Sequence, residues 1–543
     1  MSVVAIVLIF LFAVIVSVFI SRLLSEKIPL PLIQIAVGAC LSIFGFEVAF
    51  DPHLFLFLFI PPLLFLDGWR IPKEALFQEI KPIMSLAIGL VVVTVIGMGF
   101  FIHWLIPSIS LAIAFALAAI LSPTDPVSVS AMTVNSPLPS RMTHILEGES
   151  LLNDATGLVC FSFAVAAALT GSFSIASATG QFLLVALGGA AIGLIVAGVI
   201  GRLNQFLVKR TGEDPAIQIL ISLLMPFIAY LLAEHFHVSG ILAAVVAGIA
   251  MHYEKIVGRM QAATRMQSKA VWDTVQVALN GMIFILLGEQ LPAMWKILPE
   301  VTQSAGATNP WAVVGYIIVI TIGLAVLRFS WVWVSMSLTV FRSPNKRLSR
   351  HDLRLMAIMV TAGVRGAITL AGILTLPLLM TDGSPFPTRD LAIFISMGVI
   401  LCSLLIATIA LPILTKGLSE DLPYENDEIR TRLALNEAAI AHINELMNQP
   451  CEDLDEMSLR NEAGSHLLEI YSRRLDSEDS VQEGALDLKR LFSMERQLSR
   501  SALKIERDTL QQLRKSRHIS EHIFHRLRHE LDLKEEALNH HLS

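Results

Sequence analysis

Runs of about twenty apolar residues recur from the start of this chain to about residue 417. A run of this length spans the hydrocarbon core of a bilayer as a helix, because backbone polar groups in lipid must be satisfied within the segment. Hydropathy predicts about thirteen transmembrane helices, at 3–21, 28–50, 53–68, 82–107, 109–132, 144–170, 180–208, 215–234, 237–251, 269–289, 311–338, 353–379 and 389–415. An all-α membrane protein is therefore expected.

Charged residues are sparse before residue 417 and frequent after it, although they make up only 16% of the whole chain. Soluble proteins carry roughly 25% charged residues throughout. The change predicts a transmembrane domain at 1–417 and a helical, regulatory tail at 418–543.

The loops between the predicted helices differ in their content of Lys and Arg. Loops that follow odd-numbered segments contain most of these residues, whereas the alternate loops contain only Lys296 and Arg389. Short cytoplasmic loops collect positive charge, so the N-terminus is predicted outside and the tail in the cytoplasm.

The fifth segment contains Ser122-Pro123-Thr124-Asp125-Pro126. The two prolines remove backbone donors and interrupt the helix, and such a break is tolerated in a membrane only beside protein or water. Freed carbonyls and the Thr124 hydroxyl are suitable ligands for a hard alkali cation. Asp125 is a candidate site residue, and capping of the following half-helix is an alternative or additional role for it.

The sixth segment contains polar residues at helical spacing, Glu147, Glu149, Ser150, Asn153 and Asp154. Asp154 lies roughly 16 Å into this helix at 1.5 Å per residue, near the bilayer midplane where transporters place their binding sites. A charge there is costly and marks a functional site. Asp154 is therefore a candidate functional-site residue, and Glu147, nearer the entrance, is expected at the mouth of that site.

The twelfth segment contains Arg365 between Gly363 and Gly366. A buried guanidinium requires a partner, and the predicted partner is Glu149, with Asp125 as the alternative. Arg328 is expected instead to extend its charged end to the membrane surface.

Segments five and twelve cross the membrane in opposite directions, and both are interrupted. Two such helices predict an inverted-repeat transporter with its site between them. Asp125 and Arg365 are expected to neutralise the half-helix ends that meet there.

Four motifs in order resemble the sodium/proton exchangers of the NhaP and NHE type: Thr124-Asp125-Pro126, Glu149-Ser150-Leu151-Leu152-Asn153-Asp154, His237-Val238-Ser239-Gly240-Ile241-Leu242 and Gly363-Val364-Arg365-Gly366-Ala367. The resemblance covers residues 1 to about 417. It implies a homodimeric antiporter of thirteen helices with a core domain and a dimerisation domain.

The resemblance also implies roles for single residues. Asp154 would bind the cation and the proton alternately, and Ser150 and Thr124 would supply further oxygens. Asn153, Asp125, Glu149 and Arg365 would shape and stabilise the site. Because family members with Asn-Asp are generally electroneutral, Asn153 implies one-for-one exchange.

The third segment departs from the family pattern. Many relatives have a glutamate directly after Pro-Pro-Leu-Leu-Phe, whereas here Leu66 follows Phe65 and the acid is Asp67. A helix turns about 100° per residue, so Asp67 is predicted to lie outside the core site.

The resulting hypothesis is a secondary antiporter that exchanges Na+, with Li+ or K+ as further possibilities, for H+ in a bacterial inner membrane. K+/H+ exchange is the main alternative, and an intramembrane aspartyl protease using Asp125 and Asp154 is a minor one. No enzymatic activity, cofactor, nucleic-acid partner or metal other than the transported cation is expected.

The tail contains an apolar stripe of Leu510, Leu513, Ile519, Ile523, Leu527 and Leu531 in a stretch without Gly or Pro. This stripe predicts packing on a partner helix or a coiled coil. His518, His522, His525 and His529 follow one helical face, and a pH sensor, a metal site and a solvated helix are the possible interpretations.

Overall fold

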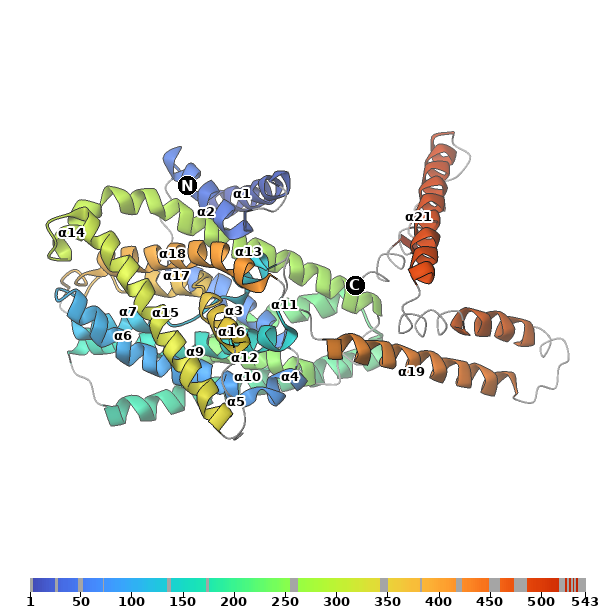
Figure 1. The fold of residues 1–543 in the computed structure, drawn as a ribbon, viewed down its shortest axis with the longest axis horizontal. Helices are drawn as coiled ribbons and strands as arrows, with labels where there is room; N and C mark the ends of the chain where they lie inside the picture. The colour runs from blue at the N-terminus through green and yellow to red at the C-terminus, as the bar shows by residue number, and fades with distance from the viewer. Residues whose placement is uncertain are drawn as a thin grey trace. The chain divides into compact units, whose positions relative to one another are not determined.

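A computed structural model gives the fold of the chain (Figure 1). It describes residues 3–24, 28–46, 52–71, 73–133, 138–171, 175–253, 262–341, 350–380, 383–416, 422–448, 460–472, 486–516, 523–524, 527–528, 531 and 534–535. The chain divides into two compact units, Met1–Glu420 and Asp421–Ser543.

The regular secondary structure of the first unit is helical within the described residues, apart from an isolated bridge between Leu379 and Pro385. Its helices are α1 (Val3–Leu23), α2 (Leu30–Ile43), α3 (Pro52–Arg70), α4 (Lys73–Gln78), α5 (Ile80–Met84), the π-helix η1 (Ser85–Leu90), α6 (Val91–Leu105), α7 (Leu111–Ile120), α8 (Pro126–Met132), α9 (Ser140–Thr170), α10 (Ile175–Thr211), α11 (Pro215–His235), α12 (Gly240–Tyr253), α13 (Ala262–Lys296), α14 (Leu298–Ser304), α15 (Pro310–Phe341), α16 (Arg350–Thr361), α17 (Ala367–Leu374) and α18 (Arg389–Thr415). Within the described residues, 8 helices are long and apolar enough to cross a membrane, and Leu30–Ile43, Leu111–Ile120 and Gly240–Met251 are shorter apolar helices. The all-α prediction is confirmed, while the number of thirteen spans stays a prediction.

Glycines bring one group of helices into backbone contact. A side chain at Gly38 on α2 or at Gly288 on α13 would collide with the backbone of the facing helix. The same holds for Gly248 on α12, which faces the Phe65 carbonyl of α3. Small residues allow this close approach between membrane helices, where lipid supplies no hydrophobic driving force. The pairs α2–α13 and α3–α12 therefore have fixed relative positions beside the site.

Two interrupted helices cross in the first unit. The helix α7 ends at Ile120 and α8 begins at Pro126, while α16 ends at Thr361 and α17 begins at Ala367. The extended segments between them meet, and the Asp125 amide donates a hydrogen bond to the Val364 carbonyl at 2.8 Å. The predicted discontinuous crossing helices are confirmed.

The second unit contains α19 (Leu422–Met447), a helix at residues 460–472 and α21 (Leu486–Lys515). Leu503 and Leu510 of α21 pack with Phe524 and Leu531 in a small apolar cluster. The ion pair of Arg507 with Glu535, at 2.5 Å, joins the same two segments.

Phe524, Leu531 and Glu535 therefore lie against α21. The predicted stripe is thus divided between two segments of one chain, and its members Leu510 and Leu531 are buried there. Ile519 and the four histidines of the predicted stripe, His518, His522, His525 and His529, lie outside the described residues.

Candidate functional site: a carboxylate beside the helix crossing

Asp154 lies in the middle of α9 and is only 3% exposed. One of its carboxylate oxygens, Oδ1, is buried and has no hydrogen-bond partner among the residues that the structure describes. A buried polar atom without a partner is costly, so this oxygen is available to bind a ligand.

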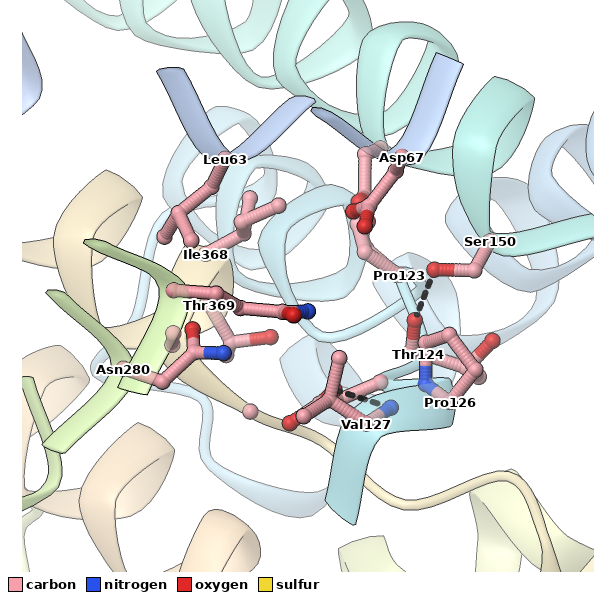
Figure 2. A pocket seen from close by; sticks show the side chains of 15 residues that line it. Leu63, Asp67, Pro123, Thr124, Pro126, Val127, Ser150, Asn280, Ile368 and Thr369 are labelled. Carbon is pink, nitrogen blue, oxygen red and sulfur yellow. Dashed lines mark hydrogen bonds between the residues drawn. The ribbon is translucent and has the colours of Figure 1, made fainter. Parts of the chain in front are cut away.

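The break between α7 and α8 is held against α9 by hydrogen bonds to Thr124. The Ser150 hydroxyl donates to the Thr124 carbonyl at 2.7 Å, as Figure 2 shows. The Asn153 side chain donates from Nδ2 to the Thr124 hydroxyl at 3.0 Å. The structure therefore brings Thr124, Ser150 and Asn153 together, and Ser150 and Asn153 lie within about one turn of Asp154 along α9.

Asp125 caps α8. Its Oδ1 accepts hydrogen bonds from the amides of Val127 and Ser128, and its Oδ2 accepts one from the Ser128 hydroxyl at 2.6 Å. Gly366 lies directly against this carboxylate, and any side chain there would collide with it. The capping role that the sequence offered for Asp125 is present, and its negative charge lies where the N-termini of α8 and α17 meet.

Arg365 lies at the opposite pair of helix ends. Its Nε donates to the Leu121 carbonyl at 3.0 Å, and its Nη1 donates to the Gly363 carbonyl. These carbonyls follow the C-termini of α7 and α16, which carry partial negative charge. Asp125 and Arg365 thus match the charges of the helix ends, as predicted.

The predicted ion pair between Glu149 and Arg365 is wrong. Glu149 forms a two-bond ion pair with Arg328 of α15, in which Nη1 donates to Oε1 and Nη2 donates to Oε2 at 2.8 Å. Both side chains are buried, and the Arg328 Nε also donates to the Met359 carbonyl of α16. The expectation that Arg328 reaches the membrane surface is therefore wrong as well.

A small recess lies beside Asp154, with a volume of about 30 Å³. Such a space holds a water molecule or an ion of similar size. Residues of five helices and both breaks line it: Leu63, Asp67, Pro123, Thr124, Asp125, Pro126, Val127, Ser150, Asp154, Gln276, Asn280, Gly366, Ala367, Ile368 and Thr369. Most of the polar groups of the predicted site therefore face one space.

Sequence reasoning missed part of this lining. Figure 2 shows Asp67 and Asn280 reaching the recess from α3 and α13. Asp67 was predicted to lie outside the core site, and that prediction is wrong. The signal was present, because Asp67 is an acidic residue within an otherwise apolar segment. Asn280 and Gln276 gave no comparable signal, since neutral amides are common in long helices.

A larger cavity of about 550 Å³ adjoins the recess and shares Asp67, Ser150 and Asn280 with it. Arg70, His144 and Glu147 line its other part. Glu147 thus lines the larger cavity and is absent from the lining of the recess. The two cavities are therefore neighbours that share part of their walls.

The amino-acid sequence was compared with models of known protein families. The sequence model described as "Sodium/hydrogen exchanger, transmembrane" matches residues 7–417. The chain belongs to the sodium/hydrogen exchanger family. The chain is similar to the "Uncharacterized Na(+)/H(+) exchanger YjcE" of Escherichia coli (strain K12), with 40% identity over 98% of both chains.

Two other similarities extend this result. A protein of Bacillus subtilis (strain 168), named "Sodium, potassium, lithium and rubidium/H(+) antiporter", is 41% identical over 83% of this chain and 67% of its own length. The solved structure of the sodium proton antiporter MjNhaP1 from Methanocaldococcus jannaschii has a TM-score of 0.57 with 16% identity. It covers 77% of this chain and 99% of that one, and it shows the shared fold.

The exchanger family consists of multi-pass membrane transporters, so the predicted antiporter fold and the absence of an enzymatic role are confirmed. The protease alternative is set aside for the same reason. A monovalent cation and a proton are the substrates of this family.

Proposed function

We propose that this exchanger moves Na+ against H+ by competition of the two ions for the carboxylate of Asp154. The supporting observation is that Oδ1 of Asp154 has no hydrogen-bond partner among the described residues and that Asp154 lines a recess large enough for a small ion. Burial disfavours a free carboxylate, so Asp154 is stable when it holds either a proton or a cation. Exchange follows if the inward- and outward-facing states interconvert only when Asp154 is occupied.

In this proposal further oxygens come from Thr124 and Ser150. Asn153 holds the Thr124 hydroxyl in place, and Asp125 and Arg365 stabilise the crossing. Arg328 takes the role of the partner of Glu149 that was expected of Arg365.

We further propose one-for-one, electroneutral exchange. Asn153 adds no second charge beside Asp154, and the charge of Glu149 is cancelled by Arg328. Asp67 also lines the recess, so this proposal requires Asp67 to keep the same charge through the cycle.

K+ and Li+ are further candidate substrates. The name of the Bacillus subtilis relative includes sodium, potassium, lithium and rubidium, and oxygen ligands of this kind accept any of these ions. The proposed setting is a homodimer in a bacterial inner membrane, with the N-terminus outside and the tail in the cytoplasm.

The test uses everted vesicles with a fluorescent pH indicator, titrated separately with Na+, Li+ and K+. The wild-type protein is expected to move protons on addition of at least Na+, and Asp154→Asn is expected to abolish this while the protein remains inserted. Asp214→Asn is a matched control, because Asp214 is an exposed cap of α11 and Asn caps equally well. Proton movement retained by Asp154→Asn would refute the site, and a membrane potential generated by wild-type exchange would refute electroneutrality.

A further inference from the structure

Arg70 ends α3 at the wall of the larger cavity. Its guanidinium is held by two residues of α13: Nη1 donates to the Gln276 side chain at 2.6 Å, and Nη2 forms an ion pair with Asp273. The side chains of Arg70 and Asp273 are 36% and 49% exposed. The pair is therefore partly exposed to solvent.

Asp67 lies three residues before Arg70 on the same helix. Residues at this spacing are neighbours on a helix surface, and an acid that precedes a base forms the favourable orientation of such a pair. Both side chains line the larger cavity, and Asp67 also lines the recess with Asp154. An unrestrained Arg70 would thus have Asp67 as its nearest helical partner.

The backbone of α3 cannot easily rotate to change this relation. Gly68 lies against the Val245 carbonyl of α12, and Gly248 of α12 lies against the Phe65 carbonyl. Asp67 and Arg70 consequently keep their direction toward the cavity, and only the side-chain position of Arg70 decides whether it reaches Asp67.

We propose that Asp273 is a positioning residue that keeps Arg70 bound to α13 and out of an ion pair with Asp67, so that the Asp67 carboxylate can attract the incoming cation. Gln276 completes the clamp by accepting the second hydrogen bond of Arg70. The Arg70–Asp273 pair is neutral as a unit, whereas an Arg70 released toward Asp67 would cancel the negative charge at the entrance to the recess. This inference rests on the proposed cation exchange.

A purely structural cross-link between α3 and α13 predicts a different pattern. Loss of either partner would then damage the protein to a similar degree, and loss of both would not repair it. The clamp predicts opposite effects of the two single variants on cation affinity, because one frees a positive charge and the other removes it.

The experiment compares full-length wild type, Asp273→Asn, Arg70→Gln, the double variant and the conservative Asp273→Glu in everted vesicles. Asp273→Asn is expected to raise the half-saturating Na+ concentration by about three- to fivefold, the range of a partly exposed ion pair, with the maximal rate retained. Arg70→Gln is expected to leave this concentration unchanged or lower it, and the double variant and Asp273→Glu are expected to restore it. Asp390→Asn is the matched control, since Asp390 belongs to an Arg–Asp pair with Arg389 and is 61% exposed.

An unchanged half-saturating concentration in Asp273→Asn would overturn the clamp, as would equal losses of maximal rate in both single variants. Na+-dependent thermal stabilisation of the purified protein provides a readout that does not depend on exchange. If neither the wild type nor any variant moves protons, the proposed function fails. The thermal-stability measurement still tests the clamp, because the clamp predicts that Asp273→Asn raises the Na+ concentration needed for stabilisation.

Discussion

The Glu149–Arg328 ion pair is deeply buried, with side chains 1% and 3% exposed. It joins α9 to α15, and Arg328 also binds the Met359 carbonyl near the end of α16. Two charges in this position are costly to bury, but removal of one partner is costlier because it leaves the other charge uncompensated. The pair therefore makes the position of α9 depend on α15 and α16.

Arg328→Gln is expected to destabilise the protein by about 3–5 kcal/mol, the cost of an uncompensated buried charge. The measurement is the melting temperature of the purified protein in detergent. Glu149→Gln combined with Arg328→Gln is expected to be less damaging than Arg328→Gln alone. Arg141→Gln is the matched control, because Arg141 pairs with Glu79 but its side chain is 70% exposed, and such pairs contribute little. A double variant as unstable as the single one would contradict this account.

The sequence predicted the polar cluster around Asp154 because local spacing decides which side chains share a turn of α9. It did not predict the partner of Glu149, since two arginines, Arg328 and Arg365, lie in apolar segments and their cost of insertion is the same. Which of them meets α9 depends on the packing of distant helices. The prediction that Asp67 lies outside the core site was wrong for a related reason. It was based on the position of a glutamate in relatives and not on the packing of α3 in this chain.

At the scale of elements, the crossing of α7–α8 with α16–α17 organises the site. Its close contact requires the absence of a side chain at Gly366, where a Cβ would collide with the Asp125 carboxylate. The prolines of the fifth segment and the glycines of the twelfth predicted these breaks, because each removes a donor or a side chain from the helix. The π-helix Ser85–Leu90 was not predicted. The Ser85 carbonyl accepts a hydrogen bond from the Trp331 indole of α15 at 3.1 Å, and a contact between such distant segments cannot be deduced from the local sequence.

Gly366→Ala is expected to push apart the break between α7 and α8 and the break between α16 and α17, because the Asp125 carboxylate must move to make room for the new Cβ. Exchange is then expected to be abolished or strongly reduced. The assay is cation-driven proton movement in vesicles with matched amounts of inserted protein. Gly315→Ala is a suitable control, since nothing lies within 4 Å of a Cβ at Gly315 on α15. Full activity in Gly366→Ala would show that the crossing tolerates a wider separation than proposed.

At the scale of the whole molecule, the residues that line the recess and the larger cavity all belong to the first unit, Met1–Glu420. The sequence predicted a boundary between a membrane domain and a tail at residue 417, close to the end of this unit. The basis was that charged residues are rare in segments that contact lipid. It did not predict that Phe524 and Leu531 pack on α21 of the same chain, since an apolar stripe does not indicate which surface will cover it.

Truncation after Glu420 is therefore expected to preserve cation-driven proton movement, while its pH dependence reports any regulatory role of the tail. The measurement compares full-length and truncated proteins across a range of pH in the same vesicles. Loss of all exchange from a truncated protein that is correctly inserted would contradict the assignment of transport to the first unit.

The central claim is that one carboxylate, that of Asp154, binds either a proton or a cation. The most direct test is isothermal titration of the purified protein with Na+ in buffers of different ionisation enthalpy, which counts the protons released on cation binding. The account predicts the release of about one proton for each Na+ bound by the wild-type protein, the stoichiometry of two ions competing for one buried carboxylate, and no coupled release from Asp154→Asn. Cation binding without proton release, or unchanged release from Asp154→Asn, would contradict it.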